Sequence, residues 1–148
     1  MLVVLQRVKK ASVEVENKII NKITNGYLIL LGVAKDDTNA DAELLVDKIS
    51  TFRIFPDKKK NMNLSIKDVG GSILVISQFT LCGDWRKGRR PSFSNSAPPE
   101  IAEKLYEQFC ELLEKKHIEI KKGQFAAMMD VELINDGPVT FVMDSKQK

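Results

Sequence analysis

Two short segments place polar groups at positions where they do not contribute to a hydrophobic core. Ser77, Gln78 and Thr80 lie at the end of an apolar, strand-like run, and the pair Gly137-Pro138 lies near the C-terminus. Hydroxyl, amide and main-chain groups can bind an ester and stabilise the oxyanion that forms when water attacks it. The alternative interpretation is structural, with the hydroxyls bonded to nearby backbone and Gly137-Pro138 forming a turn between strands. The residue types alone leave both interpretations open.

Better-known catalytic and nucleotide-binding patterns are missing from the sequence. The one histidine, His117, stands near the end of a predicted helix, where we interpret it as a surface residue favoured by the helix carbonyl pole. No GxSxG segment supplies a serine partner, and no GxxxxGK[ST] or GxGxxG segment supplies a phosphate loop. The two cysteines, Cys82 and Cys110, form no CxxC pair and are interpreted as buried residues. We therefore expect no metal ion and no cofactor.

A cluster of cations lies in the irregular segment formed by residues 83–99. Its basic residues are Arg86, Lys87, Arg89 and Arg90. Such a cluster repels itself unless a partner neutralises it, so we predict contacts with phosphate, which arginine binds in a forked geometry. A solvated surface is the alternative. Trp85 lies beside the cluster and has two interpretations. It either stacks on a base or a ribose, or it is half-buried and anchors the loop.

Hydrophobic patterning predicts many strands and two helices in the mixed order of an α+β domain. Apolar or alternating runs predict strands at residues 3–5, 12–16, 19–23, 27–33, 53–55, 72–80, 117–122, 125–134 and 139–143. One helix is predicted after Asp37 or Thr38, with Leu44 and Leu45 on its core side, and a second after Pro98-Pro99. Residues 136–137 are predicted to form a turn.

The composition is that of one soluble domain spanning residues 1–148. Hydrophobic residues make up 43%, charged residues 29%, and the net charge is +3, a mildly basic balance compatible with RNA. Two cysteines favour a reducing compartment. No apolar run is long enough for a signal peptide or a membrane span, so we expect a cytoplasmic protein without membrane attachment.

Three segments in this order resemble the D-aminoacyl-tRNA deacylase family, formerly called D-tyrosyl-tRNA deacylase. They are Ser77-Gln78-Phe79-Thr80-Leu81, Arg89-Arg90-Pro91-Ser92-Phe93 and Asn135-Asp136-Gly137-Pro138-Val139-Thr140. Similarity at Gln6-Arg7-Val8 and Phe125-Ala126-Ala127, among other places, extends the resemblance over essentially the whole chain. Two positions depart from the family pattern: Trp85 stands where a small polar residue is expected, and Met128 where an acidic or polar one is expected.

The resemblance implies a homodimer with a β-barrel-like mixed sheet and a site at the subunit interface. The implied partner is aminoacyl-tRNA, bound by its 3′-terminal adenosine and acceptor end. Gly137-Pro138 would be a Gly–cis-Pro element inserted into the other subunit's pocket. The implied wall of that pocket is formed by Ser77, Gln78, Phe79 and Thr80, with Phe125, Ala127 and Met129 nearby.

A hydrolytic mechanism without histidine follows as a hypothesis. Main-chain N–H groups near Phe79 and Thr80 would hold the oxyanion, and the 2′-hydroxyl of the RNA would orient water or carry a proton. Thr80 is either a nucleophile or a positioning group, and we favour positioning because no base stands beside it in the sequence. A rigid main-chain wedge at Gly137-Pro138 would refuse L-residues, so D-aminoacyl-tRNA and some glycyl-tRNA are the expected substrates.

Two other functions compete with this hypothesis. A non-catalytic RNA-binding module would explain the basic loop and Trp85, and turnover of substrate distinguishes it. A small-molecule esterase or amidase would hydrolyse simple D-amino esters without RNA, and its binding would not depend on salt.

Overall fold

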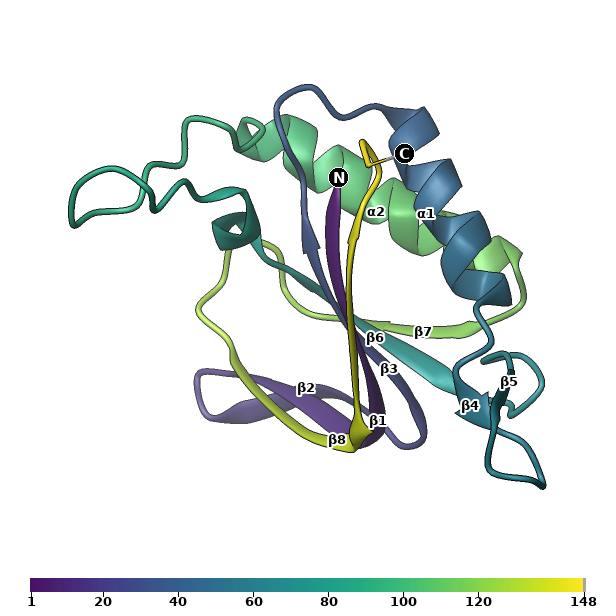
Figure 1. Cartoon of the computed structure of the whole chain (residues 1–148). Helices are drawn as coiled ribbons and strands as arrows, with labels where there is room; N and C mark the ends of the chain where they lie inside the picture. The colour runs from purple at the N-terminus through teal and green to yellow at the C-terminus, as the bar shows by residue number, and fades with distance from the viewer. Residues whose placement is uncertain (148) are drawn as a thin grey trace.

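β1 (Leu2–Val15) is the strand around which the sheet is built in the computed structural model, which describes residues 1–147 (Figure 1). Along one side, β1 pairs antiparallel with β8 (Asp130–Asp144). Along its other side, it pairs antiparallel first with β3 (Gly26–Gly32) and then with β2 (Lys18–Ile23). One long strand therefore links all the antiparallel pairings of the main sheet.

Two parallel pairings extend the sheet beyond β3. β6 (Ser72–Ser77) lies parallel to β3, and β7 (Glu119–Lys122) lies parallel to β6. β2 also contacts β6 and β7, so the mixed sheet is nearly closed. Almost every residue of β3 is buried, as its continuous apolar run predicts for a strand covered on both faces.

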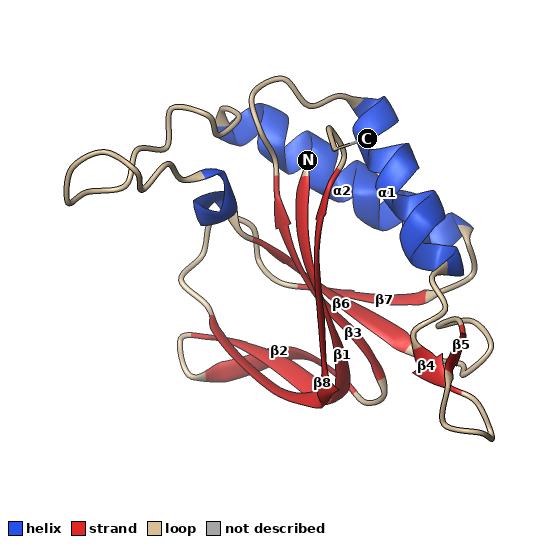
Figure 2. Cartoon of the chain, in the orientation of Figure 1, coloured by secondary structure: helices blue, strands red, loops and turns tan. Residues whose placement is uncertain are grey.

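Two helices, α1 (Asn39–Thr51) and α2 (Pro99–Lys115), cover one face of the sheet (Figure 2). Thr38 caps α1, and its N–H donates to the Asp41 carboxylate at 2.8 Å. α2 opens on Pro99, where a missing N–H costs no intrahelical bond. The short elements are β4 (Phe55–Pro56), β5 (Met62–Leu64) and the 3-10 helix η1 (Phe79–Cys82).

The sheet has a hydrophobic core on each face because side chains alternate along its strands. On the helix side, Val3 and Leu5 of β1 pack into a core that also contains Ile29, Leu31, Leu45, Ile49, Val75, Phe109 and Leu113. The second core contains Val8, Val13, Ile23, Leu28, Leu74 and Ile76. The two cores hold β3 and β6 rigidly, and these strands carry the site described below.

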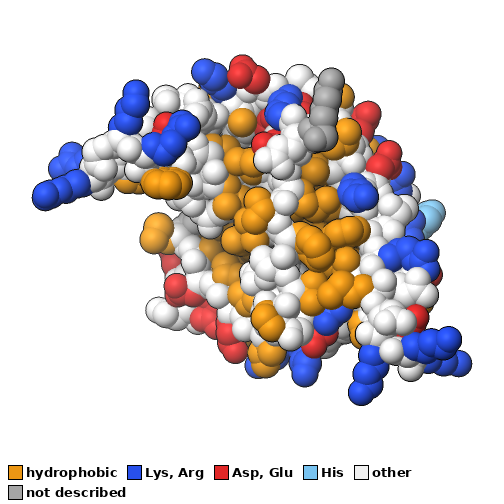
Figure 3. All heavy atoms as spheres, viewed as in Figure 1, with side chains coloured by type: hydrophobic (Ala, Val, Ile, Leu, Met, Phe, Trp, Pro, Cys, Tyr) orange, Lys and Arg blue, Asp and Glu red, His pale blue; other side chains and the backbone are white. Residues whose placement is uncertain are grey.

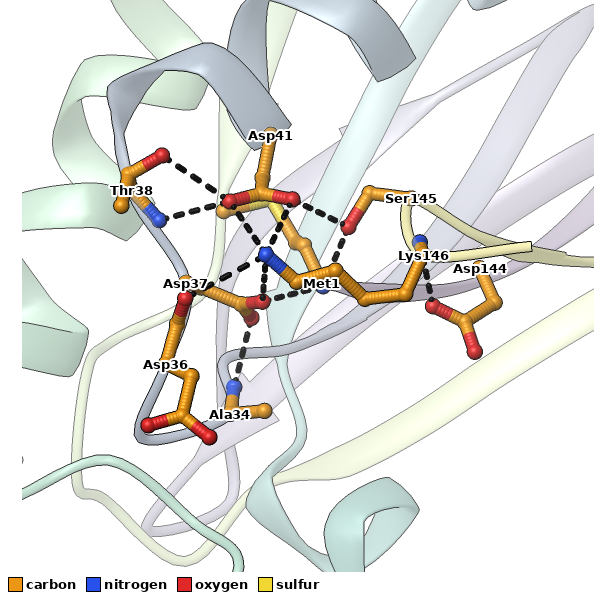
Figure 4. A network of polar contacts seen from close by, with 9 residues as sticks. All are labelled: Met1, Ala34, Asp36, Asp37, Thr38, Asp41, Asp144, Ser145 and Lys146. Atoms are coloured by element: carbon orange, nitrogen blue, oxygen red, sulfur yellow. Dashed lines mark hydrogen bonds and ion pairs between the residues drawn. The ribbon is translucent and has the colours of Figure 1, made fainter. Parts of the chain in front are cut away.

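A polar network ties both ends of the described chain to the start of α1 (Figure 4). The α-amino group of Met1 lies 2.5 Å from Asp37 Oδ1, a fully buried pair, and donates to Ser145 Oγ at 2.6 Å. Ser145 Oγ in turn donates to Asp41 Oδ1 at 2.7 Å, and Lys146 Nζ lies 2.8 Å from the same oxygen. The network therefore fixes the start of β1 and the end of β8 against α1.

The predicted α+β class and two main helices are confirmed, and the sheet that was expected to be β-barrel-like is a nearly closed mixed sheet. Several predicted boundaries are wrong. Residues 3–5 and 12–16 belong to one continuous strand, β1, and the strand predicted at residues 53–55 is β4 at Phe55–Pro56. The strand predicted over residues 72–80 ends at Ser77, since Gln78 turns the chain into η1, and the strand predicted from Phe125 begins only at Asp130. The predicted turn at residues 136–137 does not separate two strands, because β8 runs through it and pairs with β1 on both sides.

Leu44, predicted on the core side of α1, is exposed, and Val46 is buried in its place. No helix within residues 1–147 combines the length and apolar character needed to cross a bilayer.

Candidate active site

A cavity of about 340 Å³ lies where β3 and β6 end, between η1 and the first turns of α2. The carboxyl ends of neighbouring parallel strands meet at one edge of a sheet, which is where ligands of such sheets usually bind. The lining is mainly apolar, and it includes Leu31, Ser77, Phe79, Ala97, Tyr106 and Phe125. A mainly apolar pocket of this size with a few polar groups suits a small ligand or one end of a larger one.

The chain bends sharply at Gln78, which carries it from β6 into η1. The Gln78 N–H donates to Leu31 O at 2.8 Å, and its side-chain amide donates to Thr80 Oγ1 at 2.6 Å. The bonds of η1 itself begin at the Leu81 N–H. Within residues 1–147 the N–H groups of Phe79 and Thr80 find no acceptor. Phe79 lines the cavity, whereas Gln78 and Thr80 do not, so Thr80 follows the cavity wall by one residue.

Thr80 lacks a neighbouring base. Its exposed hydroxyl is bonded to the Gln78 amide, which has no basic character. His117 follows the far end of α2, roughly 22 Å along the helix from Ala102 in the cavity wall. Tyr106 Oη donates to Val75 O at 2.9 Å, and burial raises the pKa of Tyr106 above its ordinary value. A proton acceptor for Thr80 is therefore missing from these neighbours.

The cysteines are buried, as predicted. Burial raises the pKa of the Cys82 thiol, and it raises that of Cys110 to about 12. Both side chains are therefore thiols near neutral pH and unsuited to nucleophilic attack.

Residues 125–129 form a loop beside the cavity rather than part of a strand. Phe125 lines the cavity and stacks at a tilt on Tyr106, with ring centroids 5.9 Å apart. Ala126 lines it too, whereas Ala127 does not. Met129 packs into the second core instead. Of the three residues assigned here from sequence, the structure brings only Phe125 to the cavity wall.

Gly137-Pro138 lies in a bulge of β8, and its peptide bond is cis. Gln6 pairs with Thr140 and Val8 with Asn135, so four residues of β8 face Arg7 alone. Both Gly137 and Pro138 are exposed. The bulge therefore projects a main-chain surface away from the sheet.

Two residues that had no assigned role brace this bulge. Asn135 Nδ2 donates to Arg7 O at 2.9 Å and to Val139 O at 3.0 Å, closing its two ends. Arg7 is almost fully buried, and its Nη1 donates to Ile54 O at 2.5 Å. Its Nε lies 3.0 Å from Asp136 Oδ2, an ion pair in which the Nε–H is not aligned for a hydrogen bond. A charged residue inside an apolar strand was the sequence signal for Arg7.

The bulge is remote from the cavity of the same chain. Ser77 pairs with Leu31, Leu31 with Val3, and Val3 with Met143 of β8, so three strand spacings separate Ser77 from β8. Thr140, where the bulge closes, lies three residues back from Met143. Measured along the sheet, strand geometry separates Gly137-Pro138 from Ser77 by roughly 17 Å.

The basic loop follows directly after η1 and is closed by two hydrogen bonds between Asp84 and Ser92. Arg86 forms a forked pair with Asp84, with both bonds at 2.8 Å. Lys87, Arg89 and Arg90 are exposed and form no ion pair within the described part of the chain. Three of the four predicted phosphate ligands are thus available to a partner.

A wider, more open hollow of about 510 Å³ lies at the other end of the sheet. Its charged lining residues Lys10 and Glu132 are paired with one another at 3.5 Å, and Glu119 accepts from Ser72 at 2.9 Å. We place the candidate site in the smaller cavity because it lies where the parallel strands β3 and β6 end and is lined by Phe79, whose N–H has no acceptor within residues 1–147.

Comparisons with known proteins agree on one family. The family described as D-Tyr-tRNA(Tyr) deacylase matches residues 4–144. Proteins called D-aminoacyl-tRNA deacylase are 57% identical in Thermosipho melanesiensis and 54% in Thermosipho africanus, each over 99% of both chains. The solved structure of a c-Myc DNA Unwinding Element Binding Protein has a TM-score of 0.92 at 40% identity, covering 99% of this chain and 100% of that one. A probable eukaryotic D-amino acid tRNA deacylase shares the fold, with a TM-score of 0.82 at 18% identity over 96% and 97% of the two chains.

Proposed function

The chain belongs to the D-Tyr-tRNA(Tyr) deacylase family and is an enzyme that hydrolyses D-aminoacyl-tRNA, and from that premise we propose that the cavity beside η1 receives the aminoacyl ester. The observation that carries the proposal is the pair of unbonded N–H groups at Phe79 and Thr80, next to an apolar cavity. We propose the cytoplasm as the place of action because aminoacyl-tRNA is used there.

Hydrolysis requires water to attack the ester carbonyl and the 3′-oxygen of the terminal ribose to leave. The N–H groups of Phe79 and Thr80 would stabilise the oxyanion, where one donor is typically worth about 2.7–4 kcal/mol. The vicinal 2′-hydroxyl would orient the water or carry its proton, since the described residues that line the cavity include no His, Asp, Glu or Lys. Ser77 and Gln78 would shape the wall, with Gln78 orienting the Thr80 hydroxyl through their hydrogen bond.

Thr80→Ala measured by single-turnover deacylation tests the role of this hydroxyl. Because no base contacts Thr80, we expect a positioning role and a rate within about tenfold of wild type. Loss of several orders of magnitude would instead indicate a nucleophile. Phe79 N–H and Thr80 N–H remain in the variant, so oxyanion binding is unchanged.

Gly137-Pro138 is proposed to act in the cavity of a second subunit as a chiral wedge. Two observations support this: the element is exposed on a braced bulge, and it lies too far from the cavity of its own chain. A wedge of main chain would exclude an L-side chain by overlap, and each tenfold of discrimination needs about 1.4 kcal/mol. Glycyl-tRNA, which has no side chain to exclude, would also be hydrolysed.

The proposed homodimer would form through the apolar face that runs over β8 and β1 (Figure 3). Val142 is 75% exposed on this face, and it pairs with the half-buried Val4. The face is continuous along β8 with the Gly137-Pro138 bulge, so a second copy seated there would meet that element.

Val142→Asp tests the dimer. We expect sedimentation of the wild type at twice the 16.7 kDa of one chain, and loss of both dimer and activity in the variant. Ile19→Asp is the matched control, because Ile19 is an exposed apolar residue on β2, a strand that does not pair with β8. An active monomeric Val142→Asp variant would exclude the shared site.

Three measurements test this function: two separate it from its competitors, and one tests the wedge. Free D-tyrosine accumulating beyond the amount of protein excludes a non-catalytic nucleic-acid binder, a function suggested by the similarity to the c-Myc DNA Unwinding Element Binding Protein. Equal hydrolysis of L-tyrosyl-tRNA and D-tyrosyl-tRNA would refute the wedge. Activity on simple D-amino esters that exceeds activity on D-aminoacyl-tRNA would favour a small-molecule esterase.

A further inference from the structure

Trp85 is the single tryptophan of the chain, and its side chain is 80% exposed. Of the two interpretations open from sequence, anchoring the loop by burial is therefore excluded. An exposed aromatic ring of this size does not stabilise the fold, because stabilisation comes from apolar area removed from solvent. Its surface is available to a partner.

The surroundings of Trp85 are positively charged. Asp84, the residue before Trp85, forms an ion pair with Arg86. Within residues 1–147 no ion pair is formed by Lys87, Arg89 or Arg90. Three free cations on one exposed loop favour a polyanion as partner. The basic side chains are visible at the tip of the loop that projects from the molecule in Figure 3.

The position of the loop links it to the candidate active site. Trp85 follows Thr80 by five residues, which span at most about 17 Å. It borders a hollow of about 220 Å³ whose other walls include Leu81 and Cys82 of η1. Residues of η1 therefore line both hollows: Phe79 lines the ester cavity, and Leu81 and Cys82 line the hollow that Trp85 borders.

We propose that Trp85 stacks on a base of the single-stranded 3′ end of the tRNA, just before the terminal adenosine, while Lys87, Arg89 and Arg90 bind the phosphates around it. This inference rests on the proposed binding of the ester beside η1. Paired bases in an RNA helix are already stacked, so an exposed aromatic ring requires an unpaired base. The nucleotides adjoining the ester are unpaired, and they are the ones within reach of the loop.

The sole tryptophan makes binding directly observable. The full-length wild type is titrated with two uncharged RNA minihelices, one with a single-stranded 3′ CCA tail and one blunt, while binding is followed independently by anisotropy. Stacking predicts that the tailed RNA quenches Trp85 fluorescence and the blunt RNA does not. Binding of the tailed RNA without quenching, or equal quenching by both, would overturn the proposal.

Kinetics give a second, independent readout. Trp85→Ala should raise KM for a D-tyrosyl minihelix by about 5- to 150-fold, the usual value of one base–aromatic stack, and leave kcat within about twofold. Hydrolysis of D-tyrosyl-adenosine, which lacks the preceding nucleotides, should not change. Trp85→Phe should restore part of the affinity, and Ile19→Ala, at an exposed apolar residue of β2, serves as the control.

The outcomes separate this inference from the function on which it rests. A wild type that hydrolyses D-tyrosyl-tRNA, combined with an unchanged KM in Trp85→Ala, refutes the stacking and leaves the deacylase site intact. A wild type that shows tail-dependent quenching but deacylates no D-aminoacyl-tRNA refutes the proposed site and supports the stacking. Equal loss of activity on D-tyrosyl-adenosine in Trp85→Ala would overturn the stacking, because it would reveal damage to the ester cavity.

Discussion

Gly137→Ala tests whether the β8 bulge positions the wedge. Gly137 has φ +125°, a backbone conformation that side chains other than glycine rarely adopt. An added Cβ would lie 2.7 Å from Val139 Cγ2 and 3.1 Å from Arg7 Nη2, so both neighbours must move. Backbone strain of this kind costs about 1–3 kcal/mol. For a chain of this size each kcal/mol lowers the unfolding midpoint by about 2–4 °C, so we expect a decrease of roughly 2–12 °C.

The effect on catalysis should exceed the effect on stability. A displacement of about 1 Å at a positioning element can cost about 100-fold in rate, so kcat/KM for D-tyrosyl-tRNA should fall by about that factor. Gly70→Ala is the matched control: Gly70 also has a positive φ, +61°, but no atom lies within 4 Å of its added Cβ. The control should lose some stability and keep its kcat/KM. Unchanged deacylation by Gly137→Ala, at a temperature where it is folded, would refute the reasoning.

Two further predictions concern the networks that hold the ends of β8 and its bulge. Burial raises the pKa of Asp41, but hydrogen bonds led by that from Lys146 outweigh it and hold the pKa well below its usual range. The ionised carboxylate therefore stabilises the fold, and this stabilisation is complete above about pH 4 and lost as the pH falls further. Asp41→Asn should lower stability at pH 7, and its stability should depend less on pH in the acid range than that of wild type, as measured by circular dichroism. An equally steep loss of stability with falling pH would contradict this. Asn135→Ala removes the hydrogen bonds to Arg7 O and Val139 O. The variant should lose about 1–3 kcal/mol of unfolding free energy, measured with denaturant, and should hydrolyse D-tyrosyl-tRNA more slowly. An unaltered unfolding midpoint and rate would show that the bulge keeps its conformation without these bonds.

The strands and helices were largely predictable because their signals are local. Alternation along β1 and the continuous apolar run of β3 mark these strands, and Thr38 marks the start of α1. The prediction of Leu44 on the core side was wrong because helical spacing places Ala42, Leu45, Val46 and Ile49 on one buried face, and Leu44 lies off that face. Boundaries set by tertiary contacts were harder to predict.

The residues of the candidate site differ in the same way: some were predictable from the local sequence, and others depend on contacts between distant parts of the chain. Ser77 and Phe79 were predicted in the wall and line the cavity, since both follow directly from where β6 ends. Gly137-Pro138 has the sequence of a turn, yet it forms a bulge because β1 pairs with β8 on both sides of it. The bracing by Arg7 and Asn135 joins residues more than a hundred positions apart, and no local pattern encodes such a contact.

The bulge in β8 has a separate consequence for the behaviour of the protein at high concentration. β8 is an edge strand of 15 residues, and a long regular edge is a template on which other chains add by strand pairing. The four residues opposite Arg7 interrupt the row of free main-chain groups, so an incoming strand would lose register there. The opposite edge, β7, is only 4 residues long and carries Lys121. The irregularity that presents Gly137-Pro138 therefore also protects the sheet from open-ended aggregation.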